Sequence, residues 1–402
     1  MSAPLPYLPQ RVFAAEDGTH GIVPQALIAP PRYVQGPNVW ERLGRYLSLI
    51  PSTNAAILIS AGGQRRDGAR LLQSIRSAQI AATTVTFHGE CSQEEVERVV
   101  AVLRASTPAV DCVVAVGGGK CIDAGKCVAD RLGVPVVVCP SLASNDAPCS
   151  ALSVMYSPAG VFADVEYFPH SPALVVVDTQ VIAAAPVRYL VAGMGDAMAT
   201  WYEARTCLRN PQARSVLGAR PTLAASALGE LCARTLFADG VAALEAVQRG
   251  EVTDALERIV ETNTLLSGIG FESGGLALAH AVAQGLTVLP AVHQHYLHGE
   301  MVAMGLLTQL VVQSQADEFQ QVAAFFATIG LPVHLGQLGL DPDDTPALRA
   351  VMETAMTLPY IVNEPLPLSV DTLVAAARHA HTLGNDVAQR AGDAPYRALH
   401  SE

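Results

Sequence analysis

Short runs of apolar residues, each about the length of one buried β-strand, constrain the fold of this chain most. Cys112 to Val116, Val134 to Cys139 and Leu174 to Val177 are continuous apolar runs, which is typical of strands buried on both faces of a parallel sheet. A further run, Ala55 to Ser60, is followed by helical periodicity from Gly68 to Ala78. This alternation, up to about residue 185, predicts a doubly wound, Rossmann-like α/β domain.

The second half of the chain has a different character. After Pro186, strand-like runs almost vanish, and Ala, Leu and Glu recur in long stretches such as Thr222 to Leu236. A late helix is predicted from Ser369 to Leu383, ended by Gly384. We therefore expect an N-terminal extension over residues 1–24, which is a loose leader or an arm on a neighbouring subunit, an α/β domain over 25–185 and an all-α domain over 186–402.

The charge and hydropathy patterns exclude several classes of partner. The formal net charge of −12 comes without a Lys- or Arg-rich block, so no nucleic acid partner is expected. No apolar stretch approaches the length of a membrane span, and Met1 to Pro6 lacks the basic start and apolar centre of a secretory signal. We expect a soluble, cytoplasmic protein without a membrane partner. Its eight cysteines form no Cys-x-x-Cys pair and are expected to be reduced thiols.

A glycine-rich turn joins a predicted strand to a segment of helical composition. Backbone N–H groups at the start of a helix can bind a diphosphate, and Lys120 or Lys126 could add a formal positive charge. The turn therefore predicts a dinucleotide site. It is not a G-x-G-x-x-G fingerprint, and a tight turn without a ligand is the alternative. The turn consists of Gly117, Gly118, Gly119 and Lys120.

The next predicted strand runs into a polar loop, Pro140 to Ser150. Ligands of open α/β sheets bind beyond the carboxyl ends of the strands, which is where this loop starts. Its hydroxyl groups could line a cofactor, and Asp146 could accept hydrogen bonds from a polyol. Ordinary turn chemistry is the alternative.

One carboxylate and two imidazoles of the second half predict a metal site with a coordination position left open for substrate: Asp196, His280 and His298. Asp196 lies in an apolar, helix-compatible segment, where a buried carboxylate needs a compensating charge. The alternative is a carboxylate at a helix N-terminus, satisfied by backbone donors. His280 could equally be a core histidine, and His293 and His295 lie close to His298, so the pattern alone does not select the ligands.

Five segments of the chain resemble the glycerol dehydrogenase branch of the iron-containing (group III) alcohol dehydrogenases. The resemblance runs from about Ala29 through the last helices, and the block from Ser144 to Tyr156 is specific to that branch. It implies a dehydroquinate synthase-like, two-domain architecture, in which the α/β domain binds NAD and the all-helical domain binds a metal. The five segments are Val114 to Lys126, Pro140 to Tyr156, Val191 to Trp201, Gly268 to His280 and His298 to Ala303.

The same resemblance implies roles for individual residues of the α/β domain. Gly119 and Lys120, together with the two preceding glycines, would meet the diphosphate of NAD. Asp146 would bind substrate hydroxyls and take part in catalysis. The NAD groove would be lined by Ser141, Ser144, Ser150, Leu152 and Tyr156.

In the helical domain the resemblance implies that Asp196, His280 and His298 are catalytic and hold one zinc ion per subunit. The eighteen-residue separation of the two histidines matches the family pattern. Iron enzymes of the superfamily have a further histidine four residues after the aspartate, and here that position is Thr200. Its absence favours zinc, although two imidazoles and a carboxylate also suit Fe²⁺.

Two departures from the family pattern bear on specificity. Glycerol dehydrogenases commonly carry another histidine three residues after the first histidine ligand, whereas this chain has Ala283 there. The acidic residue that holds the adenosine ribose is replaced within Ser60 to Arg66, where arginines could accommodate a ribose 2′-phosphate. The resemblance therefore leaves NADP as an alternative to NAD.

The implied reaction is oxidation of glycerol, or a related vicinal diol, to dihydroxyacetone, with hydride transfer from C2 to nicotinamide C4. The same fold and metal with another substrate, such as 1,2-propanediol or hydroxyacetone, is the alternative. A phosphosugar lyase or a phosphoglycerol dehydrogenase would need basic residues at the substrate end, and the segments around the three metal candidates are poor in Lys and Arg. A non-catalytic subunit would require those candidates to be accidental. The expected partners are a small polyol and further copies of the chain, from a dimer to an octamer.

Overall fold

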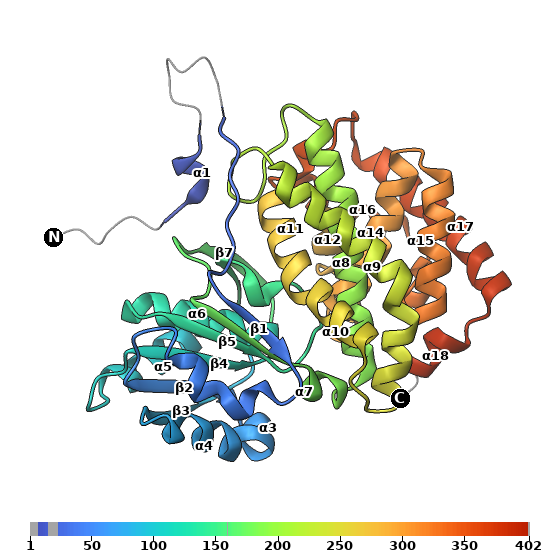
Figure 1. The fold of residues 1–402 in the computed structure, drawn as a ribbon. Coiled ribbons are helices and arrows are strands. Elements are labelled where there is room, and N and C mark those ends of the chain that lie inside the picture. The colour runs from blue at the N-terminus through green and yellow to red at the C-terminus, as the bar shows by residue number, and fades with distance from the viewer. Residues whose placement is uncertain (1–6, 15–22, 159, 401–402) are drawn as a thin grey trace.

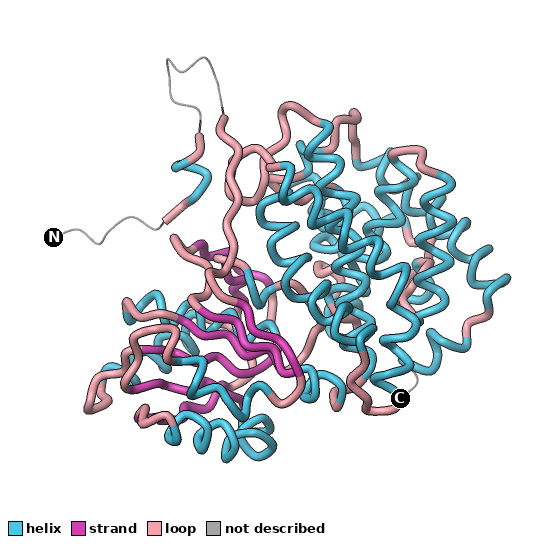
Figure 2. Tube along the Cα trace, in the orientation of Figure 1, coloured by secondary structure: helices cyan, strands magenta, loops and turns pink. Residues whose placement is uncertain are grey.

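The computed structural model describes residues 7–14, 23–158 and 160–400. They form a sheet domain and a helical domain that lie side by side (Figure 1). Figure 2 shows that the strands are confined to the first of these and that helices make up the second. The predicted fold class, an α/β domain followed by an all-α domain, is confirmed, whereas the boundaries at residues 24 and 185 stay predictions.

The central sheet has six parallel strands in the order β1-β8-β5-β4-β2-β3. Its inner strands are apolar on both faces because helices cover both sides. Ile57 and Ile59 pack under the helices after β2, whereas Ala56 and Leu58 face the opposite layer. The strands are β1 (Tyr33–Gly36), β2 (Asn54–Ser60), β3 (Ala81–Phe87), β4 (Cys112–Gly117), β5 (Val136–Pro140) and β8 (Leu174–Asp178).

Two sets of helices cover this sheet. One face carries η1 (Val39–Arg42), α2 (Leu43–Leu47), α3 (Ala61–Gly63), the π-helix η2 (Gln64–Gly68) and α4 (Ala69–Ser77). The other face carries α5 (Gln93–Arg104) and α6 (Gly119–Leu132). The remaining elements of this half are α1 (Pro9–Val12), η3 (Ala147–Cys149), α7 (Thr179–Ala183) and an antiparallel hairpin of β6 (Leu152–Tyr156) and β7 (Phe162–Tyr167).

The helical domain packs its core around α8, α12 and α14, and the sheet joins this core through Val138, Val175 and Val177. One continuous core therefore links the two domains. The helices are α8 (Val187–Arg209), α9 (Leu223–Gln248), α10 (Asp254–Glu261), η4 (Thr262–Leu266), α11 (Ser267–Gly274), α12 (Leu278–Leu286), α13 (Pro290–His295), α14 (His298–Val312), α15 (Ala316–Ile329), η5 (Leu335–Leu338), α16 (Thr345–Thr357), η6 (Ile361–Asn363), α17 (Val370–Ala391) and α18 (Ala394–His400).

The predicted end of the late helix at Leu383 was wrong. Helix α17 runs through Gly384 to Ala391, and it ends at Gly392, whose positive φ of 85° is a conformation that favours glycine. A Cβ on Gly384 would lie 1.7 Å from the carbonyl oxygen of Val333. This glycine therefore permits close packing inside the helix and does not terminate it.

The predicted N-terminal extension falls partly outside the described residues, since residues 1–6 and 15–22 are not among them. The side chain of Gln10 in α1 donates a hydrogen bond to the carbonyl of Val216 at 2.9 Å. All eight cysteines are free and buried. No single helix of the described residues combines the length and the apolar character of a membrane span. Asp254–Gly274 and Leu278–Leu286 reach that length and character only as a pair, and they are bent by 105° relative to each other.

Candidate active site

A cavity of about 2740 Å³ lies between the carboxyl edge of the sheet and the helical domain. Its sheet side includes Ser60 at the end of β2, Gly117 at the end of β4 and Ser141 just after β5. Beyond β2 the chain turns to one face of the sheet, and beyond β4 it turns to the other. Open α/β sheets bind ligands at such a switch point.

The glycine turn forms one wall of this cavity. Gly118 precedes α6 without a side-chain cap, and its φ of −82° is open to any residue. The glycines are needed for close approach: a Cβ on Gly119 would lie 2.6 Å from the side-chain nitrogen of Asn145, and one on Gly118 would lie 3.2 Å from Leu142. The turn therefore brings helix-terminal N–H groups to the cavity wall, which suits a diphosphate.

The two lysines of α6 have different surroundings. Lys120 lines the cavity, donates to Glu90 at 2.6 Å and lies over the ring of Tyr156 at 5.2 Å. Lys126 is buried and does not line the cavity. The prediction that Lys126 could add a positive charge at the diphosphate site was therefore wrong. Its ammonium donates to the carbonyls of Ala147 (2.7 Å) and Leu152 (2.8 Å) and to the hydroxyl of a serine, Ser150 (3.1 Å). Lys126 therefore fixes the loop that follows β5.

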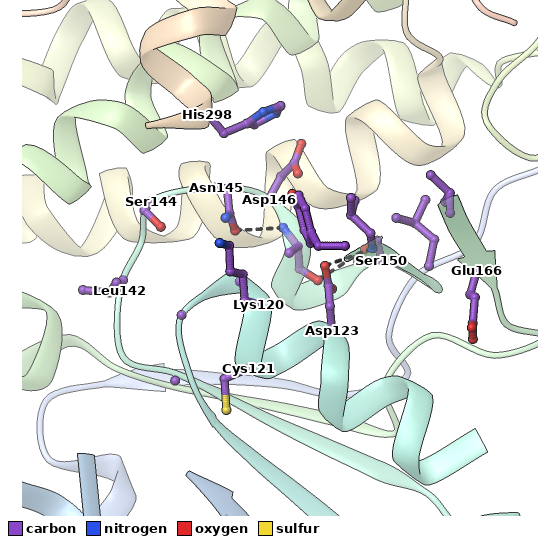
Figure 3. A pocket seen from close by; sticks show the side chains of 18 of the residues that line it. Lys120, Cys121, Asp123, Leu142, Ser144, Asn145, Asp146, Ser150, Glu166 and His298 are labelled. Carbon is purple, nitrogen blue, oxygen red and sulfur yellow. Dashed lines mark hydrogen bonds between the residues drawn. The ribbon is translucent and has the colours of Figure 1, made fainter. Parts of the chain in front are cut away.

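That loop carries three of the predicted groove residues, Ser141, Ser144 and Ser150, along the cavity, and Asp146 lies between the last two in sequence (Figure 3). The loop is also held from the helical domain, because Glu272 accepts a hydrogen bond from the amide of Ala151 at 2.9 Å. Both domains thus fix its shape. The predicted groove residues that line the cavity are Ser141, Ser144, Ser150, Leu152 and Tyr156.

The structure brings Asp196, His280 and His298 together from α8, α12 and α14. One ligand atom of each lies within 4.8 Å of the others. The Oδ1 atom of Asp196 is 3.4 Å from the Nε2 atoms of both histidines. Asp196 stands in the middle of α8, so the alternative of a carboxylate at a helix N-terminus was wrong. His293 lies elsewhere, with Nε2 against the carbonyl of Gly160 at 2.6 Å.

Close helix packing explains this convergence. A Cβ on Gly299, which follows His298, would lie 1.8 Å from the carbonyl oxygen of Ala192 on α8. A Cβ on Gly195 would in turn lie 2.5 Å from the carbonyl oxygen of Gly299. Small residues therefore let the start of α14 touch α8 beside Asp196.

The donor set fits a divalent cation. Oδ1 of Asp196 is buried and has no hydrogen-bond partner among the described residues, and such an atom is costly unless a cation or donor meets it. Burial raises the pKa of Asp196, but His298 and His280 outweigh it and lower that pKa below the ordinary value. Burial and the charge of Asp196 raise the pKa of Asp146 well above its usual range. The two carboxyl groups therefore differ in ionisation although they lie in one site.

The site contains contributors that the sequence did not single out. Glu203 lies seven residues after Asp196 on α8, and its Oε2 is 2.5 Å from Nδ1 of His280. Its other oxygen accepts the amides of Ala277 (2.8 Å) and His280 (3.0 Å). A carboxylate only accepts, so it holds the imidazole proton on Nδ1 and leaves Nε2 free toward Asp196. The seven-residue spacing, which is two helical turns, was the available signal.

Near Asp146 a second contributor is Ser267. Its hydroxyl lies 3.4 Å from Oδ2 of Asp146 and 2.9 Å from the hydroxyl of Thr200. The backbone amide of Asp146 donates to Oδ2 of Asp196 at 3.3 Å. The candidate substrate residue is thereby tied directly to a candidate metal ligand.

Of the two predicted departures, the first, Ala283, does not itself line the cavity. Gln284 lines the cavity next to the buried Ala283. The other lies at the opposite end, where Arg66 lines the cavity and Arg65 is exposed.

The chain is similar in sequence to a known protein family and to several characterised relatives. The model of iron-containing alcohol dehydrogenases matches residues 30–179. A glycerol dehydrogenase of Escherichia coli O6:H1 is 44% identical over 331 residues, which are 81% of this chain and 88% of the relative. A glycerol dehydrogenase of Pseudomonas putida is 44% identical over 365 residues, 90% of this chain and 98% of the relative.

A solved structure supports the same similarity. The crystal structure of a glycerol dehydrogenase from Schizosaccharomyces pombe superposes with a TM-score of 0.86 at 31% sequence identity, and the match covers 92% of this chain and 93% of that one. The similarity therefore spans both domains.

Proposed function

The chain belongs to the iron-containing alcohol dehydrogenase family, and from this premise we propose that it oxidises glycerol, or a closely related vicinal diol, with NAD as hydride acceptor. It is an oxidoreductase of the alcohol dehydrogenase type. The observation that carries the proposal is the buried Oδ1 of Asp196, which lacks a partner and faces two imidazoles beside Asp146 in the cavity that also holds the glycine turn.

The residues that would hold the metal ion and those that would hold NAD lie in different domains. Asp196, His280 and His298 would hold one divalent ion, and Thr200 in place of a further nitrogen ligand favours Zn²⁺ over Fe²⁺. The glycine turn and the loop after β5 would hold NAD. When bound, the ion supplies a Lewis acid that lowers the pKa of a substrate hydroxyl, and the nicotinamide supplies a hydride acceptor for the C2 hydrogen.

The chain's own residues orient the substrate and the ligands. Asp146 would accept a hydrogen bond from a second substrate hydroxyl, while the hydroxyl of Ser267 holds one of its oxygens. Glu203 fixes His280 in the tautomer that presents an unprotonated Nε2. The two walls of the cavity then keep the reacting carbon and the coenzyme in one orientation, which is the main way a binding cleft lowers such a barrier.

The second candidate is the same reaction on another small diol or hydroxyketone, such as 1,2-propanediol or hydroxyacetone. Ala283 favours it, because the imidazole that glycerol dehydrogenases commonly carry at this position is missing three residues after His280. A phosphorylated substrate is disfavoured. Asp196 and Glu203 place carboxylates at this end, and these would repel phosphate oxygens.

The test is nicotinamide absorbance with the purified protein, NAD, and a panel of glycerol, 1,2-propanediol and other diols, before and after chelation. We expect the highest kcat/KM with a vicinal diol and loss of activity on chelation, restored by Zn²⁺. Asp196→Ala and His298→Ala should lose bound metal and turnover together. A metal-free variant that remained fully active would contradict the proposal.

We further propose that the enzyme works in the cytoplasm as a homo-oligomer, from a dimer to an octamer. The composition of the chain and its resemblance to the family support this. Sedimentation velocity of the full chain would give the oligomeric state, and a monomer at micromolar concentration would contradict it.

A further inference from the structure

The cavity has an end far from the metal candidates, and the carboxyl end of β2 forms it. Strand β2 lies beside β4 in the sheet (Figure 1). Ser60 is the last residue of β2, and the pairing of Ile59 with Val116 sets it beside Gly117 of β4. In doubly wound folds that bind dinucleotides, the strand next to the glycine-bearing strand ends at the adenosine ribose, where a carboxylate binds the 2′-hydroxyl. Here a serine stands at the strand end.

The hydroxyl of Ser60 has a structural role. Its oxygen accepts the amide of Gly63 at 3.1 Å and caps the turn that leads into the following helix. A neutral hydroxyl in this position neither attracts the ribose as a carboxylate would nor repels a phosphate group.

Positive charge gathers at the same end. Arg66 and Arg70 both line the cavity, and they share the buried carboxylate of Asp67 through bonds of 2.8 and 2.7 Å. Two guanidinium groups against one carboxylate leave one net positive charge. Asp67 is only 3% exposed, and each of its oxygens already accepts a bond from a guanidinium group, so the two arginines neutralise its charge.

The guanidinium groups of the two arginines are held to different extents. Arg70 is fixed, because its guanidinium also lies over the ring of Trp40 at 5.4 Å. Arg66 bonds Asp67 through Nε, and no partner is found among the described residues for its two terminal amino groups. Its side chain is 61% exposed. A guanidinium held at one edge, with its other edge open to a cavity, suits bidentate binding of phosphate.

We propose that Arg66, supported by Arg70, binds the 2′-phosphate of NADP, so that this chain takes NADP at least as well as NAD. The inference rests on the proposed function, because it assumes that a nicotinamide dinucleotide lies in this cavity. It deepens that function by naming the residues that select the coenzyme.

The test is fluorescence titration of the full-length protein with NADH and with NADPH, in the absence of substrate. Wild type should bind NADPH with a Kd equal to or below that for NADH. Arg66→Gln should weaken NADPH binding about tenfold or more, because charge-assisted hydrogen bonds to phosphate are lost, and change NADH binding by less than about threefold.

Two further variants sharpen the result. Ser60→Asp keeps an N-capping side chain, so the turn should stay intact, but it adds a carboxylate that should tighten NADH and weaken NADPH. Arg65→Gln is the matched control, since Arg65 is exposed, has the same charge and does not line the cavity. If the guanidinium of Arg66 alone meets the phosphate, Arg65→Gln should leave both affinities within about twofold of wild type.

The outcomes separate the two proposals. Tight binding of NADH with NADPH more than about a hundredfold weaker would overturn this inference alone, since such a ratio means a site built against the phosphate. Equal losses for both coenzymes in Arg66→Gln would overturn it as well. Binding of neither coenzyme to the wild-type protein would overturn the proposed function and this inference together.

Discussion

Replacing Glu203 by glutamine should weaken metal binding without unfolding the protein. Glu203 is fully buried and contacts His280 twice, through Nδ1 at 2.5 Å and through the backbone amide at 3.0 Å. Glutamine has the same shape and keeps a carbonyl oxygen for the amides of Ala277 and His280. Its amino group, however, donates where the carboxylate accepted. The imidazole must then accept at Nδ1 and carry its proton on Nε2, the atom that faces Asp196.

The magnitude follows from the bond that metal binding must break. An Nε2 that carries a proton cannot ligate, so the ring has to return to the other tautomer and leave a buried donor without its acceptor. That costs about 1–3 kcal/mol, which is roughly a fivefold to hundredfold loss of metal affinity at about 1.4 kcal/mol per factor of ten. Loss of an outer partner of a histidine ligand commonly has this size.

The assay is competition for Zn²⁺ against a chromophoric chelator, with kcat measured at several zinc concentrations. Glu203→Gln should need more zinc for half-maximal activity, while its urea midpoint stays close to that of wild type. Glu318→Gln is the control. Glu318, on α15, pairs at 2.6 Å with Arg205, which is on the same helix α8 as Glu203, and Glu318 does not line the cavity. Wild-type zinc affinity in Glu203→Gln would refute the reasoning about the tautomer.

Three further predictions concern stability, each measured by urea denaturation. Lys126→Met should lower the free energy of unfolding by about 3–5 kcal/mol, because it leaves buried partners without their ammonium; an unchanged midpoint would refute this. Gly384→Ala should cost about 1–3 kcal/mol or more because its Cβ would meet the carbonyl of Val333. Gly62→Ala, whose nearest atom is 3.9 Å away, should be nearly neutral, and equal effects would contradict the packing argument. Burial raises the pKa of Glu272 to about 8, so the folded carboxyl keeps a proton that the unfolded chain has lost above about pH 5. The free energy of unfolding of the wild type should therefore fall by up to about 5 kcal/mol between pH 5 and 8, and that of Glu272→Gln should lack this fall. The same dependence of unfolding free energy on pH in both proteins would contradict the prediction.

The buried strands of the sheet were predictable because parallel strands covered on both faces must be apolar throughout. β4 and β8 correspond to such runs. β1 has only four residues, Tyr33–Gly36, and all are half-buried, so it carries little hydrophobic signal. The β6–β7 hairpin has mixed burial and follows the site loop. Its pairing depends on tertiary contacts that no local pattern expresses.

The candidate site was predictable in its residue types and only partly in its geometry. A carboxylate and imidazoles in apolar helices indicate a cation, and the structure does bring Asp196, His280 and His298 together. Their meeting depends on glycine contacts between helices, such as that of Gly299 with α8, which cannot be derived without the fold.

Lys126 shows how helix phase decides a side chain's surroundings. It lies six residues after Lys120, about one and two-thirds turns at 3.6 residues per turn, so the two side chains project from different faces of α6. One reaches the cavity and the other the interior. Proximity in sequence to the glycine turn was therefore a poor guide to its contacts.

All three candidate ligands, on α8, α12 and α14, come from the helical domain, whereas the glycine turn belongs to the sheet domain. A change of shape on the dinucleotide side of the cavity would therefore leave the distances among Asp196, His280 and His298 unchanged, because helices of one domain set all three. The only direct tether between the triad and the opposite body described above is the single bond from the amide of Asp146 to Asp196. Under the proposed function, the geometry that would hold the ion is therefore set apart from the geometry that would hold the coenzyme.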